Sequence, residues 1–314
     1  MTARHHHYLS QCYLKGFTKG FSKKSKLTVI DFKEKRDFET IPRNVGGRRD
    51  FNRIEIEGID PNAIESALSI FEGQANTALK KIEEKLVFEG EIKVVILNLL
   101  ALLAIRSPEM REHWSNTEIE IMERIMDLSL ETKERWESQN NRMKKDGVNI
   151  SDDITYEEVK EFYDNKKYRI ELTTDYHIRI EMDRMESILP YLFGKNWLLV
   201  KANKESGPFI TTDNPVILTW NEPDQIPLMH RDNPGYGMKK TQVYFPISKN
   251  LSLIGEFDGR EGIINGNKQL VATLNSKMLL FTYKQIYAPT IRFFYLDKDS
   301  NILQGNHILR EINA

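Results

Sequence analysis

The chain has 314 residues, of which 40% are hydrophobic and 29% are charged, as is typical of a soluble globular protein with a sizeable core. Lys and Arg (45) nearly balance Asp and Glu (46), which excludes a global basic field that would attract nucleic acid, so any such binding needs a local patch. The single cysteine, Cys12, excludes an intramolecular disulfide and a cysteine-cluster metal site, and no apolar run reaches the roughly 18 residues of a membrane helix. We therefore expect a cytoplasmic protein with no membrane segment.

The opening segment combines three histidines, His5 to His7, with apolar residues at helical spacing between residues 13 and 17. This short helix would anchor the N-terminus to the core and hold the histidines beside it. Residues 26–32 then alternate in the manner of a strand, and residues 38–41 follow a charged turn, which predicts a hairpin. Residues 44–52 are basic and contain glycines, and they are predicted to form a solvated loop.

Helical patterns dominate residues 60–193. Asp60-Pro61 predicts a helix start, because a capping carboxylate precedes a proline at the first helical position. Residues 94–105 are nearly apolar all round and predict the central buried helix, which ends at Arg106-Ser107-Pro108 because the residue before a proline leaves the helical region. An arginine at the end of an apolar helix needs a partner. Arg106 would either compensate the helix dipole or direct its donors at a phosphate or carboxylate.

The remaining helical segments are amphipathic and charged. Residues 108 to about 142 predict one long helix whose core-facing side contains Trp114, Ile121, Ile125, Leu128 and Trp136. Residues 155–163 and 174–193 predict two more helices. The second of these would bury Ile178, Met182, Met185 and Leu189.

From residue 197 the pattern changes to short strands separated by Pro, Gly, Asn and Asp: residues 197–200, 209–211, 216–218, 243–245 and 251–254. The long loop 221–240 has the length of a lid or binding loop. A helix (265–283) and strands (286–296) follow. This order predicts an α+β protein of one domain, 1–314, in which a central helical block (60–193) packs against a mostly antiparallel sheet. The sheet portion would comprise residues 1–59, with the N-terminal hairpin, and 194–314, with the C-terminal strands.

A tight turn follows the strand at residues 209–211. Thr, Asp and Asn hold turns by bonding their own backbone, and Pro215 fixes φ. Asp213 and Asn214 would thereby lie at the rim of a sheet, where binding and catalytic groups often lie. The alternative is that both residues only cap the turn.

These segments together resemble a bacterial and phage-associated family known only as domain of unknown function 4238. The segment from His6 to Phe17 is similar to the family's His-His-Tyr-x-x-Gln-x-Tyr-Leu-x-x-Phe start, with Ser10 where proline is common and Cys12 where an aromatic residue is. Gln11 matches the family's glutamine.

Two further motifs follow in the same order. Arg106-Ser107-Pro108 with Arg111 is similar to the family's Arg-Thr/Ser-Pro motif, although Leu103 stands where a glutamine is common. Residues 209–216 are similar to its Phe-x-Thr-Ser-Asp-Asn-Pro-Val turn, and residues 245–248 to a later strand end. Members occur among prophage and phage-satellite genes and some are associated with defence against phages, so the resemblance implies an antiviral effector or sensor.

If these motifs converge on one pocket, their polar side chains could cleave a phosphodiester. A histidine, His6 or His7, would be a general base or metal ligand, Asp213 would orient it or hold a divalent metal such as Mg²⁺ or Mn²⁺, and Arg106 would steady the phosphate. The proposed substrate-binding residues are Gln11, Asn214 and Arg111. Whether a metal is bound stays open.

Two other interpretations remain open, because no nuclease signature and no dense Asp/Glu cluster is present. The chain could be a binding module that recognises a nucleotide, a nucleic acid or a phage protein trigger without chemistry. Alternatively, His6 and Gln11 could tie the N-terminus to the Asp213 turn through buried hydrogen bonds, which would make the cluster purely structural. The sequence leaves the oligomeric state undetermined.

Overall fold

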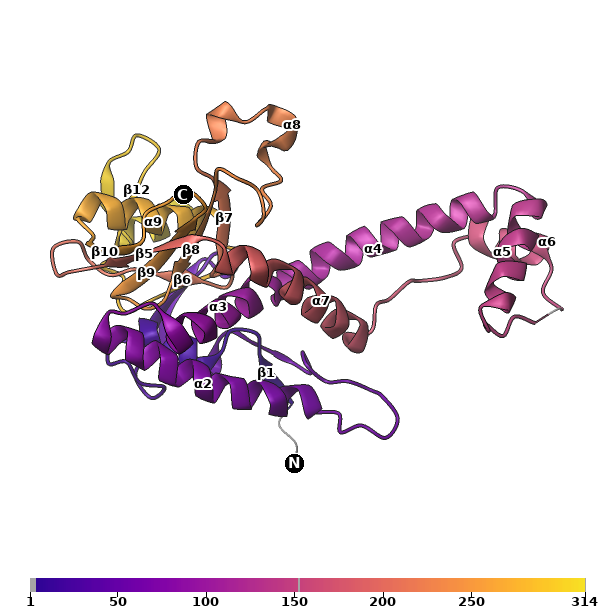
Figure 1. The fold of residues 1–314 in the computed structure, drawn as a ribbon, viewed down its shortest axis with the longest axis horizontal. Coiled ribbons are helices and arrows are strands. Elements are labelled where there is room, and N and C mark those ends of the chain that lie inside the picture. The colour runs from indigo at the N-terminus through magenta and orange to yellow at the C-terminus, as the bar shows by residue number, and fades with distance from the viewer. Residues whose placement is uncertain (1–3, 152, 314) are drawn as a thin grey trace. The chain divides into compact units, whose positions relative to one another are not determined.

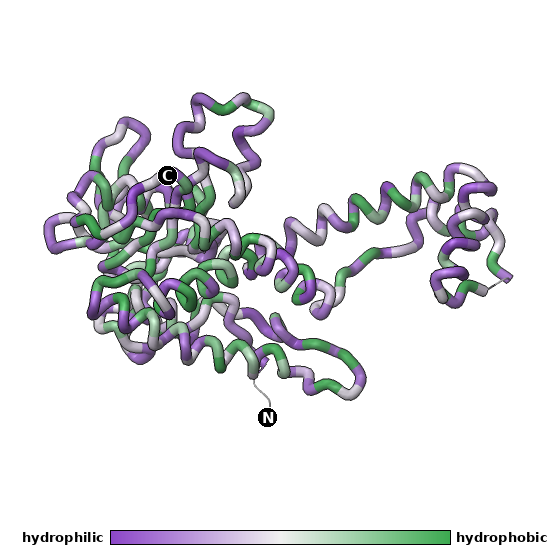
Figure 2. The backbone as a smooth tube through the Cα atoms, viewed as in Figure 1, coloured by the Kyte–Doolittle hydropathy of each residue, from purple (hydrophilic) through white to green (hydrophobic). Residues whose placement is uncertain are grey.

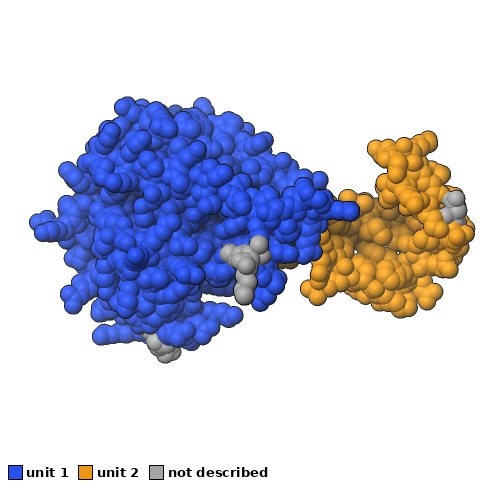
Figure 3. All heavy atoms as spheres, turned by 90° about the horizontal axis from the view of Figure 1, so that it is seen from below, with its two compact units in different colours: residues 1–108, 174–314 blue, residues 109–173 orange. Residues whose placement is uncertain are grey.

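The computed structural model describes residues 4–151 and 153–313. The chain divides into two compact units (Figure 3). The first unit combines the chain up to residue 108 with the chain from residue 174 onward, and the second comprises residues 109–173.

Two antiparallel-rich sheets form the core of the first unit. The five-stranded sheet has the order β10 (Gly262–Asn265), β5 (Asn196–Lys201), β9 (Leu251–Glu256), β8 (Thr241–Pro246) and β7 (Ile217–Trp220), in which only the β10–β5 pair is parallel. The four-stranded sheet has the order β3 (Arg36–Thr40), β2 (Leu27–Asp31), β11 (Gln285–Ala288) and β6 (Thr211–Thr212). Val29 of β2 lies opposite Tyr287 of β11. This pairing confirms the α+β fold in which the N-terminal hairpin shares a sheet with late strands.

Two small sheets complete the strands. β12 (Phe294–Leu296) pairs with β13 (Ile302–Gln304), and β1 (His5–His7) pairs with β4 (Gly47–Arg49). The prediction that residues 44–52 form only a loop is therefore wrong, since β4 supplies the partner for β1. The His5 ring packs over Gly47, where a Cβ atom would lie 2.3 Å from Nε2 of His5 in its present position. A 3₁₀ helix, η2 (Pro42–Asn44), precedes β4.

Helices α2 (Ala63–Lys85) and α3 (Gly90–Ile105) lie side by side, and α3 also contacts α7 (Thr174–Phe193) (Figure 1). Hydrophobic residues run along α3, which is buried as predicted (Figure 2). Helix α2 starts at Ala63 and not at Asp60, because the Asp60 carboxylate accepts the backbone N–H of Asn62 at 3.0 Å in a turn before the helix. On α7, Met182 is exposed, contrary to prediction, whereas Ile178 is buried.

The other helices of the first unit are short or lie late in the chain. They are α1 (Gln11–Leu14) with its continuation η1 (Lys15–Phe17), η3 (Pro223–Gln225), α8 (Leu228–Arg231), α9 (Lys268–Leu280) and α10 (Asn306–Asn313). Helix α1 packs against α2. Over residues 4–151 and 153–313, none of the helices is both long and apolar enough to cross a membrane.

The second unit is helical: α4 (Pro108–Ser129, whose first residue belongs to the first unit), α5 (Lys133–Lys145) and α6 (Tyr156–Asp164). The predicted single helix from 108 to 142 is wrong, because the Thr132 hydroxyl accepts the N–H of Arg135 and starts a new helix. Neither α5 nor α6 contains a buried residue. With little apolar surface to cover α4, three of its residues predicted to face the core are exposed: Ile121, Ile125 and Leu128.

Candidate functional site

Arg106 lies at the C-terminal end of α3 and is buried. Its Nη2 atom donates to Oδ1 of Asn52 at 2.5 Å and to the carbonyl oxygen of His7 at 3.3 Å. The guanidinium carbon also lies 5.6 Å from the centre of the Phe51 ring. The partner that a buried arginine requires is thus supplied by the segment after β4 and by β1, which joins the Arg-Ser-Pro motif to the His-His-Tyr motif.

His6 is fully buried. Its Nδ1 atom accepts a hydrogen bond from the backbone N–H of Asn52 at 2.9 Å. This nitrogen is therefore unprotonated, and its lone pair is occupied by that hydrogen bond. Asn52 therefore contacts both motifs, with its backbone on His6 and its side chain on Arg106. This arrangement fixes β1 against the segment that follows β4.

His7 differs from His6 in being partly exposed. Its Nε2 atom lies 3.1 Å from the carbonyl oxygen of Arg43, which can only accept, so Nε2 carries the proton and Nδ1 carries a lone pair. Burial lowers the pKa of His7 from its ordinary value of 6.5, although the Arg43 carbonyl acts in the opposite direction. His7 therefore favours its neutral form, the form a general base requires.

Two carboxylates on α2, which sequence reasoning did not include, belong to the same cluster. Glu65 accepts the Nδ2 donor of Asn52 at 2.6 Å. Burial raises the pKa of Glu72, and the charge of Glu65 adds to the increase, while the charges of Lys23 and Arg106 lower it. Their spacing of seven residues places both on one face of a helix, and this spacing was the signal in the sequence that could have found them.

Tyr8 connects this cluster to the Asp213 turn. Its ring packs against Phe51 with ring centres 5.8 Å apart, and its side chain lies close enough to Tyr287 for each hydroxyl to affect the pKa of the other. Burial raises the pKa of Tyr8, and the nearby charge of Asp213 adds to the increase. The three motifs of the chain therefore meet around Tyr8 and Phe51, neither of which was among the predicted site residues.

The Asp213 carboxylate is buried and accepts three backbone N–H groups from the segment that leads into β11. Oδ1 accepts from Tyr283 at 3.1 Å, and Oδ2 accepts from Lys284 at 2.8 Å and from Gln285 at 3.1 Å. Asn214 uses its backbone N–H to donate to the Thr212 hydroxyl at 3.1 Å. These bonds hold the turn and anchor β11, as the turn-capping alternative expects.

Polar side chains continue from Tyr287 across the four-stranded sheet. The Tyr287 hydroxyl donates to Oε1 of Gln285 at 2.8 Å, and Nε2 of Gln285 donates to Oδ2 of Asp31 at 2.6 Å. Tyr287, Gln285 and Asp31 therefore form a connected network. A connected buried network of this kind fixes one arrangement of the strands.

Two predicted site residues remain, Gln11 and Arg111. Gln11 is the first residue of α1 and is half-buried. Arg111 lies on α4 in the second unit, so it is not placed relative to the cluster in the first. In the described part of the chain, no three His, Cys, Asp or Glu side chains are grouped so that they could hold a metal ion. The roles of base, metal ligand and phosphate contact stay predictions.

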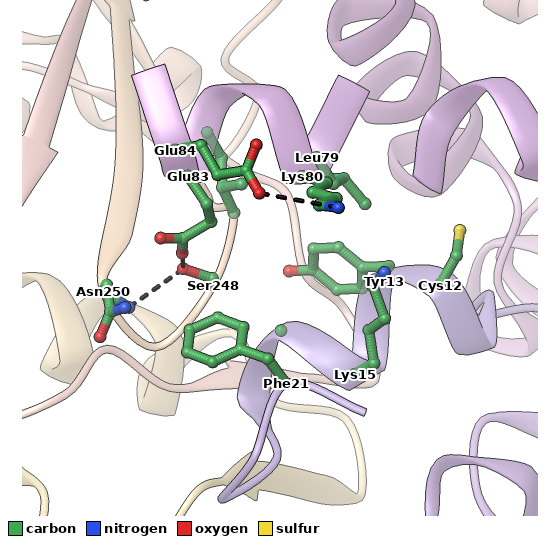
Figure 4. A pocket seen from close by; sticks show the side chains of 12 residues that line it. Cys12, Tyr13, Lys15, Phe21, Leu79, Lys80, Glu83, Glu84, Ser248 and Asn250 are labelled. Carbon is green, nitrogen blue, oxygen red and sulfur yellow. Dashed lines mark hydrogen bonds and ion pairs between the residues drawn. The ribbon is translucent and has the colours of Figure 1, made fainter. Parts of the chain in front are cut away.

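A hollow of about 320 Å³ lies beside the N-terminal helix, and none of the seven predicted site residues lines it. Lys80 and Glu83 extend into it from α2, while Lys15 and Phe21 lie on the opposite side (Figure 4). Ser248, in the turn between β8 and β9, also lines the hollow. Its volume is at the lower end of the range for small-molecule sites.

Charged groups of both signs surround this hollow. The Ser248 hydroxyl donates to the Glu83 carboxylate, and Lys80 lies 3.7 Å from Glu84 (Figure 4). Lys15 donates to the side-chain oxygen of Asn76, and burial lowers the pKa of Lys15. Two lysines and two glutamates thus line the hollow, and the lysines suit an anionic group of a ligand.

Cys12 also lines the hollow. Burial raises the pKa of the Cys12 thiol to about 11, so it is a thiol and not a reactive thiolate at neutral pH. This agrees with the sequence-based expectation that Cys12 is buried.

The comparisons with known proteins give one match. The model of a family described as a protein of unknown function (DUF4238) matches residues 5–290. No curated protein matches the chain, and no solved structure matches it.

Proposed function

Because this chain belongs to the DUF4238 family of proteins of unknown function, its own residues must indicate its role, and we propose that it is a ligand-binding module. In this proposal the hollow beside α1 is the binding site. The His-His-Tyr, Arg-Ser-Pro and Asp-Asn-Pro motifs are the framework that positions it.

The proposal rests on one observation: the acceptor atoms of the motifs already accept hydrogen bonds from other groups of the same chain. Asp213 accepts three backbone N–H groups, and Nδ1 of His6 accepts another. A ligand that contacted these side chains would have to replace hydrogen bonds that stabilise the fold. These side chains are therefore poor candidates for contacting a ligand. In the hollow, Lys15 donates to Asn76 and Lys80 is paired with Glu84, but an ammonium group has three N–H donors, so both lysines keep donors for a ligand. The partly exposed ring of Phe21 adds an apolar surface to the same hollow.

The setting that we propose is defence against phages in the cytoplasm. It is supported by the motif resemblance and by the lone buried cysteine, which suits a reducing compartment. The ligand would be a nucleotide or a phage component, and its binding would signal infection.

Ligand binding to the purified protein tests the proposal. Isothermal titration with nucleotides, short DNA and short RNA, each with and without Mg²⁺ or Mn²⁺, should show saturable binding and no product by chromatography. Lys80→Ala, at the wall of the hollow, should weaken that binding. Asn214→Ala, outside it, should not. Equal binding by both variants, or formation of product, would contradict a binding module at this position.

Phosphodiester cleavage is a second candidate, favoured by the opposite pKa shifts of two groups near Arg106. Burial lowers the pKa of His7 and raises that of Glu72, so that one suits a general base and the other a general acid. A nuclease assay separates the two candidates. If cleavage occurs, His7→Asn and Glu72→Gln should abolish it while Lys80→Ala retains the chemical step.

A further inference from the structure

A second hollow, of about 460 Å³, adjoins the first. Glu83 and Asn250 line both, so the two hollows form one groove. Three lysines line the second hollow: Lys201, Lys204 and Lys249. The groove thus extends from the N-terminal helix to the segment after β5.

The charge of this groove differs from that of the whole chain. Five lysines line it against two glutamates, whereas the chain as a whole carries a formal charge of −1. One glutamate, Glu83, accepts the Ser248 hydroxyl, and the other, Glu84, is paired with Lys80. The groove is therefore a local basic patch, the kind of feature that anion binding requires in a chain of balanced charge.

Phe21 supplies a flat apolar surface in the first hollow. Its ring is partly exposed, and Nζ of Lys249 lies 4.2 Å from the ring centre. Lys249 also donates to the carbonyl oxygens of Thr18 and Lys19, which fixes the loop that carries the ring. An exposed aromatic ring beside lysines is the combination on which nucleobases stack while phosphates bind the cations.

The backbone of Phe21 is strained. Its φ angle is 54°, in the left-handed region that bulky residues rarely adopt. Glycine would occupy this position at lower energy, so the ring at residue 21 has a cost in stability. Six other non-glycine residues of the described chain also have a positive φ, so the exposed ring beside the lysines, and not its backbone, indicates a role in binding.

From these observations we propose that the groove binds a nucleoside phosphate, with the base against Phe21 and the phosphates on Lys201, Lys204 and Lys249. The inference rests on the proposed binding function and names the chemistry of its ligand. A free nucleotide and the end of a nucleic-acid strand share that chemistry, and the experiment distinguishes them.

Isothermal titration with AMP, ATP, adenosine, tripolyphosphate and a five-nucleotide DNA tests the proposal. ATP should bind more tightly than AMP, with an affinity that falls as salt is raised. Changing Lys201 and Lys204 together to alanine should weaken ATP binding at least tenfold and leave adenosine binding unchanged. Lys284→Ala is the control, because this lysine lines neither hollow and its loss should leave ATP binding unchanged.

Phe21→Gly gives the sharper result. Because glycine relieves the positive φ, the variant should melt at the same temperature or higher, yet bind AMP and ATP at least fivefold more weakly. Phe21→Trp should retain binding. Loss of binding without loss of stability cannot be ascribed to misfolding.

The remaining outcomes are decisive. Tighter binding of the DNA than of ATP identifies a strand end, and the reverse identifies a free nucleotide. Binding of tripolyphosphate and ATP with equal affinity, unaffected by Phe21→Gly, overturns the inference, since only general anion attraction remains. If no nucleotide binds but a screen of other metabolites finds a ligand that Lys80→Ala weakens, the nucleotide inference fails and the binding function stands. If no ligand of any class binds, both fail.

Discussion

The hydroxyl of Tyr13 donates to the carbonyl oxygen of Pro246 at 2.7 Å. Its single proton is thereby used, so the hydroxyl of Thr211, 2.8 Å away, is the donor to Tyr13. Pro246 belongs to the five-stranded sheet and Thr211 to the four-stranded sheet. One buried side chain of α1 therefore joins both sheets and holds the wall of the hollow.

Tyr13→Phe should lower the free energy of unfolding by about 1–3 kcal/mol, because the Pro246 carbonyl and the Thr211 hydroxyl lose their buried partner. Urea unfolding followed by circular dichroism measures this change. Tyr191→Phe, which alters an exposed tyrosine, is the control and should have no effect. Equal stability of the two variants would mean that the Tyr13 hydroxyl is not needed to join the sheets.

Asp213→Ala should destabilise the protein by about 3 kcal/mol or more, because three backbone N–H groups lose a charged acceptor. The melting temperature should fall by roughly 5–10 °C. Asn214→Ala removes a neighbouring polar side chain and should change the melting temperature little. If Asp213→Ala instead melts normally and abolishes a reaction, Asp213 is a catalytic residue and the binding proposal is wrong.

Asn52→Leu should cost about 2–4 kcal/mol, because the buried Arg106 guanidinium loses its acceptor at 2.5 Å. The backbone N–H that donates to His6 is retained in this variant, so the change reports on the Arg106 contact and on Glu65 alone. Thermal unfolding measures it. Asn44→Ala, which removes an exposed asparagine with one side-chain hydrogen bond to Thr40, should cost much less.

His7 should make stability depend on pH. Its pKa is lowered in the folded state, so below the ordinary value of 6.5 the unfolded chain binds a proton that the folded protein resists. Stability from this group is present above pH 6.5 and is lost as the pH falls toward the lowered folded pKa. Melting temperatures measured from pH 8 to 5 should therefore decline less in His7→Asn than in the unaltered protein. Parallel curves would show that the environment of His7 does not oppose protonation.

Strong local patterns made part of the fold predictable. The alternating residues of β2 and the apolar run of α3 can be recognised from adjacent positions in the sequence alone. The β1–β4 pair joins two three-residue strands about forty residues apart, and no local pattern indicates it. The break before Thr132 contains neither glycine nor proline, so the helical pattern continued through it.

For the candidate site, the motifs indicated which segments of the chain meet, but not which of their atoms and side chains make the contacts. Arg106 contacts the backbone of His7, as convergence of the motifs requires. Asn52, however, lies in a segment without a recognisable motif, and its role follows only from the tertiary structure. Glu72 shares a helix face with Glu65, but only the tertiary structure brings Glu72 near Arg106. The run His5 to His7 does not show which ring is buried either, because this depends on the face that β1 presents to the core.

The pairing of β2 with β11 has a consequence for synthesis of the chain. Asp31 and Gln285, whose side chains are hydrogen bonded, are 254 residues apart. During synthesis on the ribosome, β2 therefore emerges long before β11, the strand with which it pairs. Until β11 has been made, Leu27, Val29 and Ile30 of β2 stay exposed to solvent. A nascent chain stalled near residue 250 should consequently be held by chaperones, and should be released once the last third has been translated.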